Sequence, residues 1–476
     1  MTRPRRVRFT ILVNRETLLT LSKDYLVDLV LAQQAQIAAQ AAQIDRLTAE
    51  VTRLSARVLE LEAKLNVPPK TPDNSSLPPS KGQKPNLPKE RKKRRHSHPG
   101  VARALAENPD RVINARLTAC PHCAHALGSA DQPEIHAYDH IDLPPIKPIV
   151  TRINRYHGIC PCCGEHVGAP APEGFPPGSP FGPELRALII HLHITQAISF
   201  ERLAIVMDEV FGVTISEGAI ANILARAEAP LVAAAEPIAE AVRASPVIGS
   251  DETSARVGGT NWWQWVLLGS TAICHVIADS RAASVVVDFL NGARPEVWVA
   301  DRYGGQNGHG EVRQICLAHL LRDAKYAIED GDNGFAPGFR WLLLRAVAIG
   351  KRRDELKDTT LIKHYRDLEK RLDRLLSRPM PDRPAARRLF RAMRRDRSDL
   401  FRFVTRRDVP YTNNACERAL RPSVIFRKVT GGFRAEWGAK VYAAAASVIA
   451  TGRLHGMSAL AALRAALAGE TVMRSV

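Results

Sequence analysis

Eight prolines and a run of basic residues between Asn66 and Gly100 constrain the fold more than any other feature of the chain. The prolines stand at positions 68, 69, 72, 78, 79, 85, 88 and 99, and Lys89-Glu-Arg-Lys-Lys-Arg-Arg95 lies between the last two. Proline removes helix and sheet options, and like charges repel one another. The chain therefore cannot fold as one globule. Residues 67–100 are predicted to be an extended basic linker, which could follow a phosphate backbone or act only as a solubilising spacer.

Before the linker, a strict heptad repeat predicts a long helix within residues 1–66. One seam position holds Val30, Ile37, Ile44, Val51, Val58 and Leu65, and the other holds Leu26, Gln33, Gln40, Leu47, Leu54 and Leu61. β-Branched residues at the first position with leucine at the second favour a parallel two-stranded coiled coil. We therefore expect a homo-oligomer, at least a dimer, with its strongest contacts between Ile44 and Leu65. The alternative is one amphipathic helix packed on its own chain.

Two Cys-x-x-Cys motifs follow, in a unit predicted to span residues 101–172. They are Cys120-Pro-His-Cys123 and Cys160-Pro-Cys-Cys163. Two such turns complete a tetrahedral zinc site, so Cys120, Cys123, Cys160 and Cys163 are candidate ligands of a structural Zn²⁺. Strands expected around 134–142 and 149–156 would form a hairpin that joins the turns. Cys162 could replace a neighbouring thiolate, a redox pair is the alternative, and weaker ligand candidates are His122, His125, His157 and His166.

Residues 173–245 are predicted to be helical. The segments Phe200–Val210 and Ser216–Ala227, separated by Phe211-Gly-Val213, fit a helix-turn-helix with Ser216 as the N-cap. Any helical hairpin gives the same pattern, so DNA binding by this region is only one reading of it.

From Pro246 the pattern changes to short apolar strands. Strands are expected at Val247–Ser250, Trp262–Leu268 and Ile273–Ala278, followed by a helix at Ser284–Leu290 and a strand at Val297–Ala300. This order fits a ribonuclease-H-like α/β domain over residues 246–430, with a helical insertion at about 330–410. A helical tail is expected at 431–476, with loops at Gly431-Gly432 and at Gly452. The predicted fold class is therefore a multidomain chain: a coiled coil, a small zinc-ribbon-like unit and an α/β catalytic domain.

Three carboxylates in this region could hold metal ions. Asp251 and Asp301 each follow an apolar strand, and neighbouring strands that end together would bring both carboxylates to one edge of the sheet. Glu417 lies near the start of a later helix. Hard oxygen ligands of this kind suit a pair of Mg²⁺ ions. The residues alone leave other roles open, because Glu417 could pair with Arg421 one helical turn away and Asp301 could cap a turn.

These motifs together resemble the transposases of the insertion-sequence-66 family, members of the DDE group. The resemblance covers nearly the whole chain, including the heptad helix, the paired Cys-x-x-Cys unit and the linker segment Asn74-Ser-Ser-Leu-Pro-Pro-Ser80. The most specific blocks are Gly249-Ser-Asp251-Glu-Thr253, Asp301-Arg-Tyr-Gly-Gly305, Cys316-Leu-Ala-His319-Leu-Leu-Arg322, Asn413-Asn-Ala-Cys-Glu417-Arg-Ala-Leu-Arg421-Pro, Arg427-Lys428 and Gly431-Gly-Phe433.

The resemblance implies that Asp251, Asp301 and Glu417 are the catalytic acids and bind Mg²⁺ or Mn²⁺. It implies a DNA transposase that cleaves the ends of an insertion sequence and joins the freed 3′-hydroxyls to target DNA. Arg302 and Gln306 depart from the family pattern after the second Asp. The element with Cys316 and His319 is expected to be structural.

The charge balance agrees with a DNA partner, because 67 Lys+Arg against 49 Asp+Glu give a formal charge of +18. Charge alone does not separate a DNA-binding protein from another basic cytosolic protein. Expected partners are the terminal inverted repeats, target DNA and accessory proteins of the same element. Arginine-rich helices of the insertion offer basic faces, and the named candidates for DNA contact are Lys89, Arg91, Lys92, Lys93, Arg94, Arg95, Arg418, Arg421, Arg427 and Lys428.

No stretch resembles a signal peptide or a membrane span, so a cytoplasmic, nucleoid-associated bacterial protein without membrane contact is expected. Two rival functions stay open on the residues alone. One is a ribonuclease-H-like nuclease without strand transfer, and the other is a zinc-containing DNA-binding protein whose acids are structural.

Overall fold

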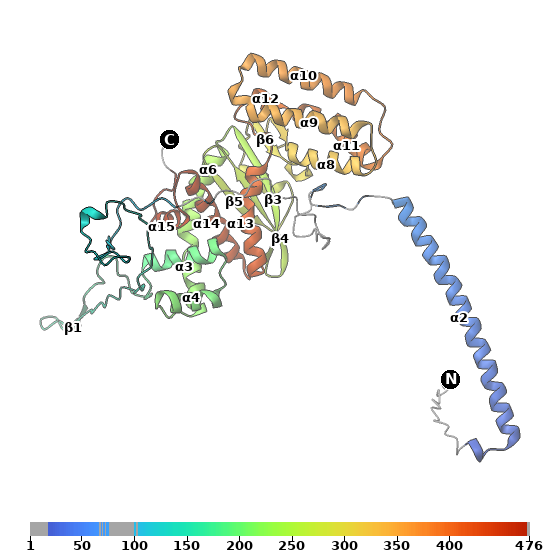
Figure 1. Cartoon of the computed structure of the whole chain (residues 1–476), viewed down its shortest axis with the longest axis horizontal. Helices are drawn as coiled ribbons and strands as arrows, with labels where there is room; N and C mark the ends of the chain where they lie inside the picture. Colours follow the sequence, from blue (N-terminus) through green and yellow to red (C-terminus); the bar gives the residue numbers. More distant parts are fainter. Residues whose placement is uncertain are drawn as a thin grey trace.

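The computed structural model describes residues 18–65, 68, 70, 71, 73–75, 100 and 103–473. The basic run 89–95, with its six candidate DNA contacts, lies outside the described residues. The described chain is a mixed α/β body with a central sheet, from which an N-terminal helix and a long excursion project (Figure 1).

The N-terminal helix is α2 (Lys23–Leu65), which extends away from the body. Among its described seam residues, Ile37, Ile44, Val51 and Leu54 are each more than half exposed. The predicted helix is therefore present, and these four apolar side chains are not buried within this single chain.

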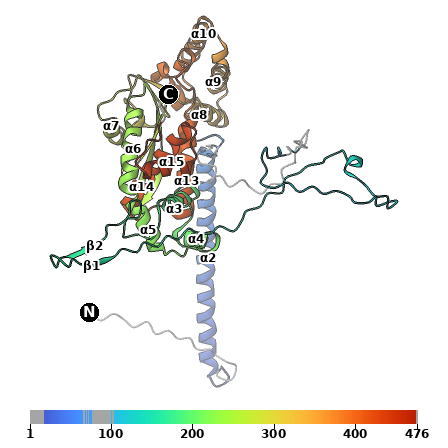
Figure 2. The ribbon, with the colours of Figure 1, turned by 90° about the vertical axis from the view of Figure 1, so that its left-hand side faces the viewer.

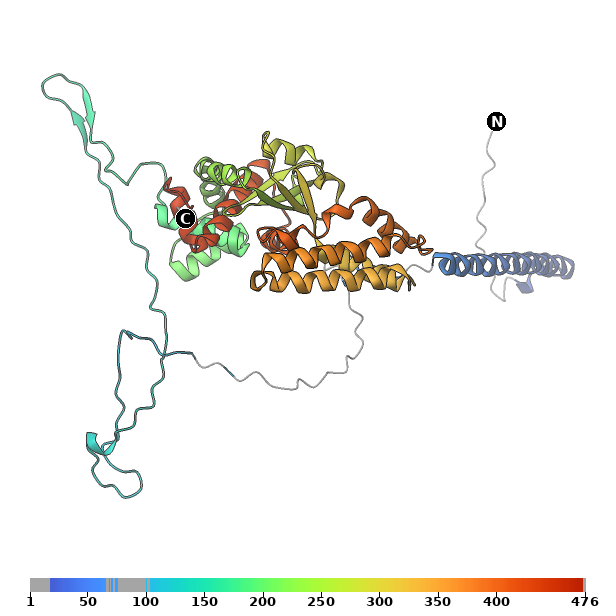
Figure 3. The same cartoon turned by 90° about the horizontal axis from the view of Figure 1, so that it is seen from above.

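Residues 103–182 form the excursion, which is almost wholly exposed and extended (Figure 3). Its regular elements are the short η2 (Ser129–Asp131) and a hairpin of β1 (His157–Ile159) and β2 (His166–Gly168). The strands predicted around 134–142 and 149–156 are wrong, because neither segment pairs with another strand. Apolar residues there are exposed, and Ile149 is 96% exposed.

The central sheet has five strands in the order β5-β4-β3-β6-β7. β3, β4 and β5 pair antiparallel, whereas β3 pairs with β6, and β6 with β7, in parallel. The strands are β3 (Val247–Val257), β4 (Thr260–Leu268), β5 (Ile273–Ala278), β6 (Val297–Ala300) and β7 (Val312–Ile315), with η3 (Gly304–Gln306) between the last two.

One prediction about β3 is wrong. Asp251 does not end a strand, because β3 continues to Val257 by antiparallel pairing with β4. The parallel neighbour β6 ends earlier, and its pairing with β3 runs only from Val247 to Gly249. Asp251 thus lies in mid-strand, just beyond the point where β6 stops.

Helices cover one face of the sheet with a shared core. The core holds Leu231 of α6, Trp265 and Trp298 of the sheet, Val448 of α14 and Leu463 of α15, all buried. Segments expected as separate helical regions before and after the sheet therefore pack together on it (Figure 2). The helices are α3 (Pro183–Gln196), α4 (Phe200–Phe211), α5 (Glu217–Arg226), α6 (Glu228–Arg243), α7 (Ser284–Leu290), α14 (Glu436–Leu454) and α15 (Ala459–Leu467).

The helical hairpin α4–α5 follows from local signals. Gly212 ends α4 in the left-handed conformation (φ 62°), and Ser216 caps α5 by accepting the N–H of Ala219 at 3.2 Å. By length and composition alone, the described stretch 217–243 could cross a membrane. In the fold, however, Leu231 and Val242 of this stretch are buried in the core.

The other face carries the helical insertion and α13. Val297, Val299 and Ile315 pack against the insertion, whose own core includes Phe339 and Phe390. The elements are α8 (Leu317–Glu329), α9 (Phe335–Arg352), η4 (Arg353–Glu355), α10 (Asp358–Leu376), α11 (Pro384–Arg395), η5 (Arg397–Asp399), α12 (Arg402–Thr405) and then α13 (Asn414–Thr430).

The loop predicted at Gly452 is also wrong, because α14 continues to Leu454. A Cβ at Gly452 would stand 2.6 Å from Cβ of Ala462 on α15. The glycine allows the two helices to approach closely rather than breaking α14.

Side chains cover both outer strands of the sheet. On α14, Ser447 Oγ accepts the N–H of His275 at 2.8 Å, and Thr451 Oγ1 bonds both backbone groups of Ile273, with Ile273 N at 3.0 Å and Ile273 O at 3.1 Å. At the other outer strand, Arg402 Nε donates to the carbonyl of Arg313 in β7 at 3.1 Å. Several polar backbone groups of these strands thus have side-chain partners.

Candidate active site

Asp251 and Asp301 come from adjacent parallel strands. Gly249 of β3 pairs with Val299 of β6. Two residues further along both strands, the same register places Asp251 beside Asp301. Side chains alternate between the faces of a strand. Gly249 faces α13, since a Cβ there would lie 3.0 Å from Cys416 Sγ, and Asp251 shares that face. Both aspartates are partly exposed, and Asp301 Oδ1 also accepts the N–H of Tyr303 at 2.8 Å, which caps a turn.

Glu417 reaches the same region from the first turn of α13. The buried Asn413 ties this turn to β3, because its Nδ2 donates to the carbonyl of Ser250 at 2.7 Å. Its backbone N–H points to Cys316 Sγ at 3.1 Å. The start of α13 is therefore held directly beside Asp251 and the start of α8.

The acids act on one another electrostatically. Burial raises the pKa of Asp251 well above its usual range, and the negative charges of Glu252, Asp301 and Glu417 raise it further. The arrangement concentrates negative charge where β3 and β6 part, and a bound divalent cation would relieve that repulsion.

Two side chains of α8, Arg322 and His319, lie against the carboxylate of Glu417. Arg322 donates to Glu417 Oε1 at 3.3 Å, and His319 Nε2 lies 3.8 Å from the same oxygen. Burial and the charge of Arg322 lower the pKa of His319, which favours the neutral ring. His319 Nδ1 is buried with no hydrogen-bond partner in the described part of the chain. Glu417 thus pairs with α8 rather than with Arg421, and His319 lies at the site.

Glu252 belongs to a separate network on the opposite face. Its carboxylate is almost fully buried and accepts from Arg281 at 2.6 Å and from Gln306 Nε2 at 2.6 Å. Gln306 also accepts from Trp298 Nε1 at 3.2 Å. Arg281 stacks over the ring of Tyr303, 3.8 Å from its centroid. This network, which the sequence does not predict, holds the loop that follows Asp301.

Chemically, the three acids suit a hard divalent cation, because each offers carboxylate oxygens and Asp251 has no cationic partner among the residues that the structure describes. In the described residues, however, no three His, Cys, Asp or Glu side chains lie close enough together to hold a metal ion. Glu417 is turned to Arg322 and His319 instead. Metal binding through all three acids would therefore require Glu417 to leave that pair.

The two Cys-x-x-Cys motifs form matching turns. Cys120 accepts the N–H of Ala124 at 2.9 Å and donates to His125 at 2.8 Å, and Cys160 repeats both bonds with Gly164 and Glu165 at the same distances. Backbone N–H groups within each turn lower the pKa of Cys120 and of Cys160. Each turn thus favours a thiolate, the form that binds zinc.

The structure does not bring these turns together. The first lies just before η2 and the second lies in the β1–β2 hairpin, at opposite ends of the excursion (Figures 2 and 3). The strands expected to join them are not formed, and Cys123, Cys162 and Cys163 are exposed. Each Cys-x-x-Cys turn therefore supplies two of the four predicted zinc ligands.

The basic residues proposed for DNA contact on α13 lie on its outer side. Arg418, Arg421 and Lys428 are exposed, and Arg427 donates to Ser254 Oγ at 2.7 Å. They flank the helix that carries Glu417.

Comparison with known proteins gives one family match. The family model described as "Transposase IS66 family" matches residues 178–441, more than half of the chain. No curated protein matches the chain. The matched residues include Asp251, Asp301 and Glu417 and leave out α2, the linker and both Cys-x-x-Cys turns.

Proposed function

The chain belongs to the IS66 family of transposases, and from this membership we propose that it cleaves the ends of an insertion sequence and joins the freed 3′-hydroxyls to target DNA. DNA is the substrate class that the family implies. The formal charge of +18 supports this, because a basic surface gains affinity for phosphates through release of counterions.

The strand order supports a ribonuclease-H-like catalytic domain. Three antiparallel strands followed by two parallel ones, with helices on both faces, are what we expect of this fold. In this arrangement the first and fourth strands of the domain lie side by side, which brings Asp251 and Asp301 together.

The observation that carries the proposal is the convergence of Asp251, Asp301 and Glu417 on one face of the sheet. We assign them as the catalytic acids and as ligands of Mg²⁺ or Mn²⁺. When bound, such ions would activate the attacking hydroxyl and stabilise the leaving oxygen. The protein's own part is to hold the carboxylates: β3 and β6 carry the two aspartates, and Asn413 anchors the helix that carries Glu417.

Two further assignments concern the N-terminal third of the chain. We assign Cys120, Cys123, Cys160 and Cys163 to one structural zinc site, which the thiolate-stabilising turns support. Exposed Ile37, Ile44, Val51 and Leu54 support pairing of α2 with a second copy. A cytoplasmic place at the nucleoid, and contacts with other proteins of the same element, follow from the assigned reaction.

The test is neutral substitution of each acid in the full-length protein. Asp251→Asn, Asp301→Asn and Glu417→Gln should each abolish cleavage of labelled element ends with Mg²⁺ or Mn²⁺ while DNA binding persists. Glu436→Gln, an exposed acid at the start of α14, is the control that should cut normally. A Glu417→Gln protein that cuts at the normal rate would remove Glu417 from the site. Cleavage without joined product would point to a nuclease, and binding without any cleavage to a DNA-binding protein.

A further inference from the structure

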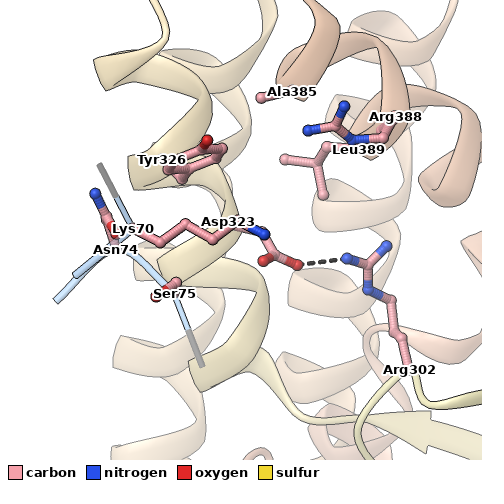
Figure 4. Close-up of a pocket in the computed structure, with 9 residues that line it drawn as sticks. All are labelled: Lys70, Asn74, Ser75, Arg302, Asp323, Tyr326, Ala385, Arg388 and Leu389. Atoms are coloured by element: carbon pink, nitrogen blue, oxygen red, sulfur yellow. Dashed lines mark hydrogen bonds and ion pairs between the residues drawn. The ribbon is translucent and has the colours of Figure 1, made fainter. Parts of the chain in front are cut away.

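A pocket of about 560 Å³ lies between the linker and the helical insertion, and Arg302, the residue after Asp301, lines it (Figure 4). Its walls come from the linker, the loop after β6, helix α8 and helix α11. A pocket of this size can hold a nucleotide with its phosphate. The lining residues are Lys70, Asn74, Ser75, Arg302, Asp323, Tyr326, Ala385, Arg388 and Leu389.

The linker wall is docked by specific hydrogen bonds. Asn74 is 3% exposed, and its Nδ2 donates to Glu329 Oε2 at the end of α8 at 2.5 Å. Asn74 Oδ1 accepts the N–H of Thr71 at 2.6 Å, and Ser75 Oγ donates to the carbonyl of Thr71 at 2.6 Å. The described part of the linker is thus folded into a compact turn and attached to α8, which brings Lys70 to the pocket.

The pocket carries more positive than negative charge. Lys70, Arg302 and Arg388 line it, and Asp323 is the one acid among the described residues that line it. Asp323 pairs with Arg302, so the charges of Lys70 and Arg388 are left to attract an anion. Arg388 is exposed on α11 and reaches toward the pocket (Figure 4). Guanidinium and ammonium groups are the usual protein partners of phosphate.

We propose that this pocket binds a phosphate of the DNA backbone, and that docking of Asn74 on Glu329 assembles it. The proposal rests on the proposed function and deepens it, because Arg302 follows Asp301 directly in the chain. The loop that begins at Asp301 thus forms one wall of the pocket. The linker therefore forms part of the DNA-binding surface and connects α2 to it.

The first experiment measures the charge contribution. Binding of a labelled duplex of the element end to the full-length protein is followed by fluorescence anisotropy over a range of salt concentrations. Lys70→Gln and Arg388→Gln should each weaken binding and reduce the slope of log affinity against log salt by about one. Arg391→Gln, an exposed arginine of the same helix that does not line the pocket, should leave the slope unchanged.

The second experiment tests the hydrogen bond from Asn74 to Glu329, which we call the latch, by whether its loss weakens or strengthens DNA binding. Glu329→Gln removes a negative charge but keeps an acceptor for Asn74, so DNA binding should stay equal or become tighter. Glu329→Ala removes the same charge and also the acceptor, so binding should weaken and the salt slope should fall by about one as Lys70 leaves the pocket. Simple electrostatics predicts tighter binding for both variants, and that result would overturn the latch.

Three outcomes separate the possibilities. If Lys70→Gln and Arg388→Gln bind the duplex like the parent, the pocket does not bind DNA and the proposal fails. If inorganic phosphate or a free nucleotide binds the pocket at constant ionic strength without displacing the duplex, the anion is a free ligand and the proposal fails. If the parent protein binds DNA but never cleaves it, the transposase assignment fails while the pocket remains testable by binding alone.

Discussion

Replacing Asn413 with alanine would remove the side-chain bond that ties the first turn of α13 to strand β3. In the folded protein Asn413 Nδ2 donates to the carbonyl of Ser250 at 2.7 Å, and the side chain is 3% exposed. Alanine leaves that buried carbonyl without this donor, while the backbone bond from Asn413 to Cys316 remains. The change therefore isolates one contact between β3 and the helix that carries Glu417.

The magnitude follows from burial. Leaving a buried acceptor unsatisfied costs about 1–3 kcal/mol. For a domain of about 150–250 residues, each kcal/mol lowers the melting temperature by about 2–4 °C, so Asn413→Ala should melt about 2–12 °C below the parent. Activity should fall further than stability, because Glu417 lies one helical turn from Asn413. Displacement of a catalytic group by about 1 Å can lower a rate about 100-fold.

The assay pairs thermal unfolding, followed by circular dichroism, with cleavage of labelled element ends at a temperature well below both melts. Asn414→Ala is the matched control, since Asn414 is the next residue but is exposed. Asn413→Ala should be less stable and slower, and Asn414→Ala should match the parent in both. If Asn413→Ala melted and cut like the parent, the bond to Ser250 would have no role in placing Glu417.

Further predictions concern the acids, the zinc and α2. The pKa of Asp251 is raised in the folded state, so the stability of the metal-free protein should fall as pH rises from the ordinary carboxyl range toward that raised pKa. In thermal melts, the Asp251→Asn protein should lack this fall, and Mg²⁺ should not stabilise it. Glu252→Gln should cost about 1–3 kcal/mol in unfolding experiments and slow cleavage without weakening DNA binding, because Arg281 loses its buried partner; unchanged cleavage would make that network dispensable. Elemental analysis should find one zinc per full-length chain and less in Cys120→Ser, and a zinc-free folded protein would contradict the site. Deleting residues 1–66 should lower the number of chains per particle measured by light scattering. A full-length protein that is monomeric at micromolar concentration would contradict pairing through α2.

Elements with strong local signals could be predicted from the sequence. Gly212 and Ser216 mark the turn between α4 and α5 through a left-handed cap and a side-chain cap, both of which depend only on nearby residues. Strands β5 and β6 lie where their apolar runs placed them. In such segments local preference and tertiary packing agree.

Other features depend on residues far away in the chain. Strand β3 continues through the polar residues after Asp251 because β4 pairs with it, and nothing in the polar run itself indicates a strand. In the sequence, Gly452 suggests a break in the helix. In the fold, the glycine makes room for Ala462 of α15.

For the candidate site, the resemblance implies the three acids and includes His319 and Arg322, but it does not say which groups pair with which acid. Arg322 is separated from Glu417 by 95 residues, and Gln306 from Glu252 by 54. Such pairs arise only when strands and helices pack, and periodicity cannot find them. The departure of Gln306 from the family pattern is the kind of signal that could have suggested a buried network, since Gln306 accepts from Trp298 in the fold.

Side chains that bond the outer strands of the sheet affect how closely copies of the protein can approach. They are the hydroxyls of Ser447 and Thr451 and the guanidinium of Arg402. An outer strand with unpaired N–H and C=O groups is a template on which another copy can add a strand, the first step toward aggregation. In this chain α14 engages the backbone of β5, and Arg402 engages that of β7. Many copies of a DNA-binding protein can gather on one molecule of DNA. Because side chains of α14 and Arg402 occupy backbone groups of the outer strands, a neighbouring copy has fewer free groups on which to add a strand.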